Sequence, residues 1–411
     1  MAWVPAGAGG APAAALPQGV LARVTGAVLC PGGGAGGAAG CASGLEVGSE
    51  VAELEALLEL LASRCPRARD VVLLSSAFVA GPRAGPIPPE PLPAALGPCA
   101  RDVSALAAHL RLPSAQVLRK AAAELAAAEW MRVQRPDFDL HILRPSLVGA
   151  PESEAFAKCP GGDLTPVQGL LALALVGVLH TVSAPAAAKV DLVPLDEVGR
   201  AAARLARGGA PARGGSWLGR RKAGRLPRVH HCVRGLAGSC TVGELVSACN
   251  LLALRYRNQQ HLWRFVACDP DPRVHAAARR LEGLLPTLLA AVAPALGGGR
   301  ERAAVAAARA LTKLGSIHDS QALEFFTRHT WDFAPPGGAG ARPSHGAEGA
   351  AAAMREARAA GEALAERGVL ARERPPNWRA EYCVQKLADA ARGLVLRLPR
   401  RRPRPAPYLP N

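Results

Sequence analysis

A chain of 411 residues is long enough for two or three domains, each able to bury its own hydrophobic core. Hydrophobic residues make up 49% of the sequence, which argues for a globular protein. The net charge is +16, yet no run combines basic residues with the stacking aromatic side chains of a nucleic-acid groove. We therefore expect no nucleic-acid partner, and a basic surface of this kind also attracts anionic lipids and phosphate-bearing small molecules.

Membrane spans and secretory signals have sequence patterns that are not found here. The apolar candidates, residues 169–179 and 283–296, are shorter than the roughly 20 residues of a spanning helix. The N-terminus has no charged region followed by a clear apolar run, so a secretory signal is not expected.

The ten cysteines are spaced neither as C-x-x-C nor as pairs suited to zinc, so we expect reduced, mostly structural thiols. His230-His231-Cys232 is the cluster that most invites a metal interpretation. Neighbouring residues of an extended strand point to opposite faces, so we prefer strand packing and expect no metal site.

Residues 1–44 are low-complexity around one short apolar piece at 20–30 and are expected to be poorly ordered, with a buried strand at 20–30 as the open alternative. Apolar residues then recur at helical spacing over 47–65. The continuous apolar run from Val71 to Leu74 suits a parallel strand buried on both faces. The sequence therefore predicts a helix followed by a strand.

Residues 80–98 are rich in proline and glycine and are predicted to form a loop before a helix over 113–131. A second strand is predicted at 140–143 and a third at 190–194, where Asp196 is expected to cap the next helix. The alternation of strands and helices predicts an α/β fold with a parallel sheet.

The composition divides the chain into four segments. A low-complexity segment at 1–44 precedes an α/β domain at 45–250, which contains a Gly/Arg linker at 207–227 and a strand at 229–233. Residues 251–395 are predicted to form an all-α C-terminal domain, and 396–411 a basic proline-rich tail. Thr241 and Glu244 have the spacing of a capping box at a helix start.

Six stretches resemble the fatty acyl-CoA reductase family, and they occur in the family's order. Four are VVLLSSAFVAG (71–81), RKAAAE (119–124), LRPSLVGAPESEAF (143–156) and KVDLVPLDEV (189–198). The fifth, ALEFFTRHTWDF (322–333), and the sixth, Pro376-Asn377-Trp378 with Tyr382, are similar to the family's C-terminal male-sterility domain.

This resemblance implies an extended short-chain dehydrogenase with a Rossmann-like parallel sheet. The implied activity is NADPH-dependent reduction of long-chain acyl-CoA to a fatty alcohol by way of the aldehyde. In that chemistry a Ser or Thr polarises the carbonyl and a Tyr donates the proton. A Lys lowers the pKa of the Tyr and holds the nicotinamide ribose.

By resemblance, Ser76 takes the Ser/Thr position and Lys120 the lysine position. The tyrosine should lie four residues before the lysine, one helical turn back on the same face, but Gln116 stands there. The resemblance also places Pro145 and Ser146 beside the nicotinamide. From the residues alone, the less favoured alternatives are a turn former at a strand end for Ser76 and a solvated helix lysine for Lys120.

A glycine-rich dinucleotide loop should join the first strand of a Rossmann fold to a helix. Val24-Thr25-Gly26-Ala27 imitates its opening, and the glycine-rich run at 32–40 follows. We interpret that run as low-complexity sequence leading into no helix, so the first, cofactor-binding half of the sheet is predicted to be incomplete.

Two functional hypotheses follow from these residues. The first is an active NADPH-dependent acyl-CoA reductase. The second is a catalytically inactive relative that binds acyl-CoA, a lipid surface or a partner reductase, because Gln116 replaces the proton donor. The resemblance is compatible with an intracellular location at the surface of the endoplasmic reticulum, a peroxisome or a plastid. A third hypothesis, a nucleic-acid-binding or scaffold protein, is supported by the charge alone.

Overall fold

The computed structural model describes residues 17–31, 44–153 without 84, 113 and 114, 181–208 without 183, 226–253, 331–333 and 347–366, and single positions or pairs within 167–175 and 267–329. The chain divides into two compact units. The first comprises residues 1–163, 189–239 and 320–348, and the second comprises 164–188, 240–319 and 349–411.

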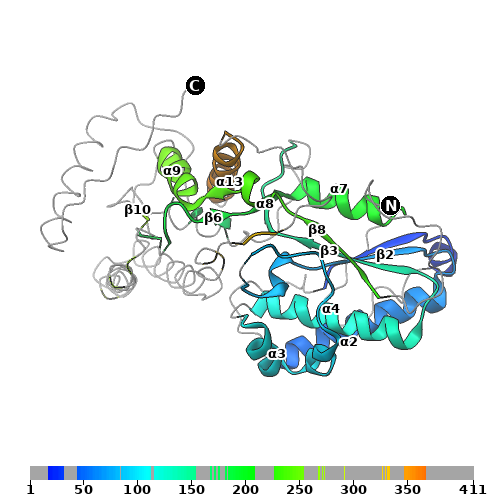
Figure 1. Ribbon diagram of the computed structural model, residues 1–411. Coiled ribbons are helices and arrows are strands. Elements are labelled where there is room, and N and C mark those ends of the chain that lie inside the picture. Colours follow the sequence, from blue (N-terminus) through cyan, green and yellow to red (C-terminus); the bar gives the residue numbers. More distant parts are fainter. Residues whose placement is uncertain are drawn as a thin grey trace, which may run out of the picture. The chain divides into compact units, whose positions relative to one another are not determined.

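A parallel sheet forms the centre of the first unit (Figure 1). Its strands lie in the order β1 (Gly26–Leu29), β2 (Asp70–Leu74), β3 (Asp139–Pro145) and β8 (Arg228–Cys232). Each neighbouring pair is parallel. The predicted α/β fold with a Rossmann-like parallel sheet is therefore confirmed.

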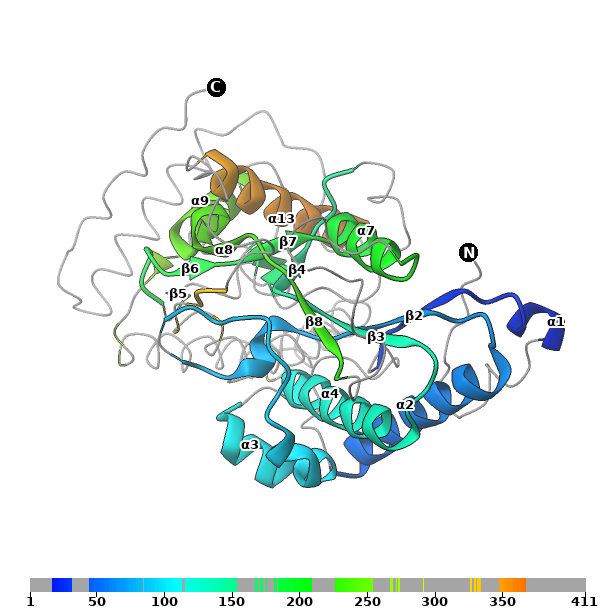
Figure 2. The same ribbon diagram turned by 45° about the vertical axis from the view of Figure 1, so that its right-hand side comes forward.

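Helices cover both faces of this sheet, because successive side chains of each strand point to opposite sides. Helices α2 (Gly44–Arg64) and α4 (Ala115–Gln134) lie on one face, with Leu58, Val71 and Ile142 in the shared core. Helix α7 (Leu195–Leu205) lies on the other, where Val72 and Leu143 pack against it. Figure 2 shows the same two helical layers from a second direction.

The N-terminal segment contributes more regular structure than the sequence predicted. Helix α1 (Gln18–Leu21) and strand β1 both lie within residues 1–44, and β1 pairs with β2 over its full length. Helix α2 begins at Gly44, so the interpretation that the glycine run leads into no helix is wrong. The reason is that the apolar residues 27–29 hydrogen-bond to a buried strand, which outweighs the low-complexity composition around them. Residues 32–43 lie outside the described residues.

The predicted loop at 80–98 is partly helical. A short 3-10 helix, η2 (Ala77–Ala80), follows β2, and a second, η3 (Ala94–Arg101), precedes α3 (Val103–Leu110). The side chain of Asp102 accepts a hydrogen bond from the backbone N–H of Ala105 at 3.0 Å and caps α3.

The strand predicted at 190–194 does not join the main sheet. It divides into β6 (Lys189–Val190) and β7 (Leu192–Pro194), and β7 pairs in parallel with β4 (Leu147–Gly149). Strand β8 takes the fourth place of the main sheet instead. The break falls at Asp191, whose buried carboxylate turns toward hydrogen-bond donors from other segments.

The residue that caps α7 differs from the one predicted from the sequence. Pro194 is the N-cap residue and Asp196 lies inside the first turn. The Asp196 carboxylate accepts the backbone N–H of Glu152 at 3.1 Å and pairs with Arg200 at 3.1 Å. Asp196 therefore ties a separate loop to the helix start, and Pro194 begins the helix with its fixed φ.

In the second unit, β5 (Thr181–Val182) pairs in parallel with β10 (Ala267–Cys268). Helices α9 (Val242–Ala253) and α13 (Ala347–Glu366) are its longest described elements, and β9 (Cys240–Thr241) precedes α9. The predicted capping box is confirmed, because Glu244 accepts the Thr241 N–H at 2.7 Å and the Thr241 hydroxyl accepts the Glu244 N–H at 3.1 Å. Most of the predicted all-α domain at 251–395 lies outside the described residues.

The aromatic stretch at 322–333 was predicted to be part of the C-terminal helical domain. Residues 320–348 instead belong to the same compact unit as the parallel sheet. The physical reason is aromatic burial, since Phe326, Trp331 and Phe333 are 6%, 5% and 0% exposed there. No helix within the described ranges is long and apolar enough to cross a membrane.

A chain of titratable side chains crosses the sheet on its α7 face. His141 lies between the other two members, 3.1 Å from Asp70 and 3.0 Å from His230. Desolvation lowers the pKa of His230 to about 4, and the neighbouring His141 and Arg228 add to this effect. Residues 230–232 are part of strand β8, so the strand interpretation of these residues is confirmed. Within the described ranges, no group of three His, Cys, Asp or Glu residues could hold a metal ion.

Acid is expected to destabilise the protein through His230. Because its folded-state pKa is depressed below the ordinary 6.5, the neutral form stabilises the fold, and this contribution is lost as the pH falls from about 6.5 to about 4. The expected loss is roughly 1–3 kcal/mol after allowance for partial exposure. Urea unfolding of the native protein and a His230→Gln variant at pH 4.5 and 7.5 checks this. A pH difference that persists unchanged in His230→Gln, or vanishes in a control with the exposed His109→Gln, would contradict it.

Candidate functional site

Lys120 brings a buried amine to the carboxyl ends of two strands. Helix α4 directs its Nζ to the carbonyl oxygen of Pro31 at 2.7 Å and to that of Leu74 at 3.2 Å. Pro31 follows β1, and Leu74 is the last residue of β2. In open parallel sheets this edge is the place where ligands bind.

The surroundings of Lys120 shift its proton affinity. Burial lowers the pKa of the Lys120 amine below its usual range, while Cys30 and Glu50 oppose that effect. The nearby Arg119 guanidinium lowers it further and pairs with Glu50 at 3.1 Å. The lysine is thus a partly desolvated donor, with two of its three N–H groups bound to backbone carbonyl oxygens within the described part of the chain.

Ser76 lies two residues beyond Leu74, at the start of η2. Its hydroxyl oxygen accepts the backbone N–H of Phe78 at 3.4 Å, so Ser76 is the cap of that turn. The hydroxyl and the Lys120 ammonium lie near the same strand end, but no hydrogen bond joins them among the described contacts. Ser76 therefore caps a turn, as the first interpretation predicts, and it also lies close to the strand end that binds Lys120, where the second interpretation places it.

Ser75 has a buried hydroxyl beside this turn. Its side chain is 5% exposed, and its Oγ makes no hydrogen bond within the described part of the chain. Its backbone N–H donates to the carbonyl oxygen of Leu143 at 2.8 Å, which fixes the end of β2 against β3. A buried polar atom of this kind normally has a partner.

Gln116 lies one turn before Lys120 on α4, and its side chain is exposed to solvent. An amide side chain has no proton acidic enough to protonate an alkoxide. The position that the resemblance assigns to the proton donor is therefore accessible but has the wrong chemistry.

Two of the motifs are joined by a buried ion pair. Arg144, the sixth residue of β3, donates from Nε to Glu124 Oε1 at 2.8 Å and from Nη2 to Glu124 Oε2 at 2.6 Å. Both side chains are 1% exposed, and Arg144 also donates to the carbonyl oxygen of Glu90 at 2.9 Å. Glu124 lies one turn beyond Lys120, so this pair fixes the helix that carries the lysine to the neighbouring strand.

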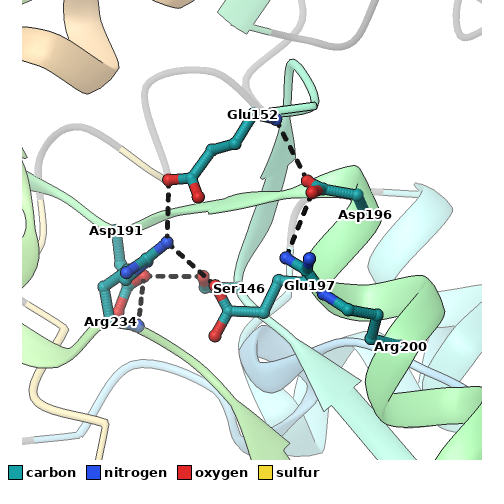
Figure 3. Close-up of polar contacts among 7 residues, drawn as sticks. All are labelled: Ser146, Glu152, Asp191, Asp196, Glu197, Arg200 and Arg234. Atoms are coloured by element: carbon teal, nitrogen blue, oxygen red, sulfur yellow. Dashed lines mark hydrogen bonds and ion pairs between the residues drawn. The ribbon is translucent and has the colours of Figure 1, made fainter. Parts of the chain in front are cut away.

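Pro145 and Ser146, which the resemblance places beside the nicotinamide, are both buried. Pro145 is the last residue of β3 and is paired with Cys232, and Ser146 is 4% exposed. The Ser146 hydroxyl donates to Asp191 Oδ1 at 2.7 Å, as Figure 3 shows. The only hydroxyl proton of Ser146 is therefore engaged within the protein in the described structure.

Asp191 is the centre of this polar cluster. Besides Ser146 it accepts the backbone N–H groups of Arg234 at 3.0 Å and Gly235 at 2.9 Å, at the start of α8 (Gly235–Gly238). Burial raises the pKa of Asp191, while these hydrogen bonds act in the opposite direction. The carboxylate joins the end of β3, the break between β6 and β7, and the end of β8.

Arg234 closes the cluster on its exposed side (Figure 3). Its guanidinium contacts Glu152 at 3.1 Å and Glu197 at 2.9 Å. Sequence reasoning missed these residues and the Glu124–Arg144 pair. Asp191 and Glu124 are both part of the quoted motifs. A charged residue beside apolar neighbours was the sequence signal that could have indicated a buried polar contact at each position.

Among the described residues there is a candidate for binding the nicotinamide ribose of a dinucleotide, whereas the candidate segment for its pyrophosphate is not described. Within the described part of the chain, its two hydrogen bonds leave Lys120 one N–H group for a ribose hydroxyl at the strand ends. The pyrophosphate would need backbone N–H groups at a helix N-terminus. The candidate for that role is the connection from β1 to α2, and its residues 32–43 lie outside the described ones.

Comparisons with known proteins support part of the resemblance. Residues 51–202 match the family model described as Male sterility protein, and this range contains all five predicted site residues. A comparison with curated proteins found no match.

Solved structures give three further similarities. The terminal R domain from the myxalamid PKS-NRPS biosynthetic pathway is 17% identical, with a TM-score of 0.42, over 79% of this chain and 64% of that one. MoeE5 in complex with UDP-glucuronic acid and NAD is 19% identical, with a TM-score of 0.32, over 50% and 53%. UDP-glucuronic acid 4-epimerase from Bacillus cereus in complex with NAD is 12% identical, with a TM-score of 0.34, over 57% and 64%. The chain thus spans less than two thirds of each.

Proposed function

We propose that this chain is an NADPH-dependent reductase of long-chain acyl-CoA that produces a fatty alcohol by way of the aldehyde. The observation that carries the proposal is the buried Lys120 amine at the carboxyl ends of β1 and β2, bound to the carbonyl oxygen of Leu74, two residues before Ser76. Both residues lie within the range that matches the Male sterility protein family. The resemblance of the quoted motifs supplies the substrate class.

The chain's own residues would bind and orient the reactants. When bound, a reduced nicotinamide would supply the hydride for the thioester carbonyl carbon, the coenzyme A thiolate would leave to give the aldehyde, and a second reduced nicotinamide would supply the hydride that converts the aldehyde to the alcohol. Lys120 binds the ribose hydroxyls through its remaining N–H, and the two carbonyl oxygens that hold its ammonium keep it in place. The Ser76 hydroxyl donates a hydrogen bond to the carbonyl oxygen of the substrate, which stabilises the negative charge that develops there.

The charge of the chain suits both reactants. Acyl-CoA and NADPH each carry several phosphate charges, and a net charge of +16 attracts such anions. The same charge suits the surface of an anionic membrane, where a long acyl chain is delivered. We therefore keep an organelle membrane surface as the proposed location.

A second function is supported by one specific observation. Gln116 is exposed at the proton-donor position and cannot act as an acid. We propose as the alternative a catalytically inactive relative that binds acyl-CoA, a lipid surface or a partner reductase. The two proposals differ in turnover and agree in acyl-CoA binding.

Replacing Lys120 tests the cofactor half of the proposal. A Lys120→Met variant is expected to bind NADPH about 10–100-fold more weakly, because a charge-assisted hydrogen bond to the ribose is lost. Titration of NADPH fluorescence measures this, with Lys189→Met as the matched control because Lys189 is a partly buried lysine within another quoted motif. Equal NADPH affinity in all three proteins would exclude Lys120 as the ribose-binding residue. Acyl-CoA binding without any NADPH binding would favour the alternative.

A further inference from the structure

Four aromatic rings meet directly behind the Ser76 turn. The ring of Phe78, in η2, lies 4.6 Å from Phe326, 4.9 Å from Trp331 and 5.2 Å from Phe333, measured between centroids. All three contacts are edge-to-face, an arrangement that aromatic pairs favour. The rings come from segments about 250 residues apart along the chain, and both segments belong to the first compact unit.

Backbone contacts fix the distant segment to the same loop. The Ile87 N–H donates to the carbonyl oxygen of Asp332 at 2.7 Å, and Ile87 forms a parallel β-bridge with Phe333. Ile87 and Phe333 are both fully buried. The segment at 331–333 therefore joins the loop after η2 through main-chain and side-chain contacts together.

The conformation of the turn is restricted at both ends. On one side Ser76 accepts the N–H groups of Phe78 and Val79 with its hydroxyl and carbonyl oxygens. On the other, Gly81 has a φ of 71°, and a Cβ there would clash with the carbonyl oxygen of Leu110. Between these ends, Phe78 is the side chain through which the aromatic cluster contacts the turn.

We propose that Phe333, together with Trp331 and Phe326, is a positioning residue for Ser76. Packing of the three rings on Phe78 holds η2 in the geometry in which the Ser76 hydroxyl caps it. This role rests on the proposed function, because it assumes that Ser76 contacts the substrate. The distant aromatic stretch thereby becomes part of the candidate site and not of a separate helical domain.

Hydrogen exchange of the full chain tests the positioning role without requiring turnover. In Phe333→Ala the amides of residues 78–81 are expected to exchange at least about 10-fold faster, because the turn opens locally. The amides of β3 are expected to be unchanged, and Phe333→Leu is expected to restore most of the protection. Phe138→Ala is the matched control, because Phe138 is 2% exposed and stacks on Trp130 away from the turn.

Two exchange results would overturn the proposal. One is unchanged exchange at residues 78–81 in Phe333→Ala. The other is a uniform rise across the sheet of the same size as in Phe138→Ala, which would indicate general destabilisation. Where turnover is measurable, Phe333→Ala is expected to lower kcat with little change in the KM for NADPH, and an unchanged kcat would also count against it. Absence of turnover in the unmodified chain would reflect on the proposed function alone, since the exchange result stands without it.

Discussion

Replacing Glu124 by alanine is expected to lower the free energy of unfolding by about 3–5 kcal/mol, because it leaves the buried Arg144 guanidinium without its counter-charge. Both side chains are 1% exposed, and two hydrogen bonds of 2.6 and 2.8 Å join them. Total stabilities of single domains are about 5–15 kcal/mol, so this loss would be a large fraction. Urea unfolding followed by circular dichroism measures it.

A surface pair provides the matched control. Arg101 donates from Nη2 alone to both carboxylate oxygens of Glu55, at 2.7 and 2.9 Å, and the two side chains are 68% and 32% exposed. Glu55→Ala is therefore expected to change stability by at most about 1 kcal/mol. A double variant, Glu124→Leu with Arg144→Met, should recover part of the loss because it removes both buried charges. A loss below about 1 kcal/mol in Glu124→Ala would refute the role given to the pair.

The sequence predicted the elements whose pattern is local. The run at 71–74 is a continuous apolar segment, the stretch at 140–143 is apolar apart from His141, and both are buried central strands. The helix at 113–131 agrees closely with α4 because its helix-forming residues are uninterrupted. Strand β1 was left only as an open alternative within 20–30, since four residues amid glycine and alanine carry little pattern until β2 pairs with them.

The candidate site was predictable where a motif was complete in one stretch. Ser76 and Lys120 come from two such stretches, and the structure brings Lys120 to the carbonyl oxygen of Leu74, next to Ser76. The contacts of Asp191 were not predictable, because its partners lie 43 to 45 residues away and depend on how β7 leaves the main sheet. The packing partners of Phe333 were missed for the same reason. An aromatic side chain is expected to be buried, but its packing partners depend on the fold.

Introducing a tyrosine at position 116 is expected to raise acyl-CoA-dependent NADPH oxidation by about 10²–10⁴-fold, the usual contribution of one positioned general acid. Positions 116 and 120 are one helical turn apart on α4, so the phenol would stand beside the Lys120 amine. A cationic neighbour lowers the pKa of a phenol and favours proton release to the developing alkoxide. The side chain of Gln116 is exposed, so the larger ring is expected to fit without disturbing the core.

The comparison uses palmitoyl-CoA as substrate and follows NADPH absorbance in the unmodified chain, in Gln116→Tyr and in Gln134→Tyr. Gln134 is the matched control because it is an exposed glutamine at the far end of the same helix. The unmodified chain and Gln134→Tyr are expected to be equally slow. Rapid turnover by the unmodified chain would show that a proton donor other than tyrosine operates, with Gln116 outside the mechanism. No turnover in any of the three proteins, with palmitoyl-CoA still bound, would exclude the reductase proposal and leave the binding role. Lys120 and Ser76 would then have no catalytic function.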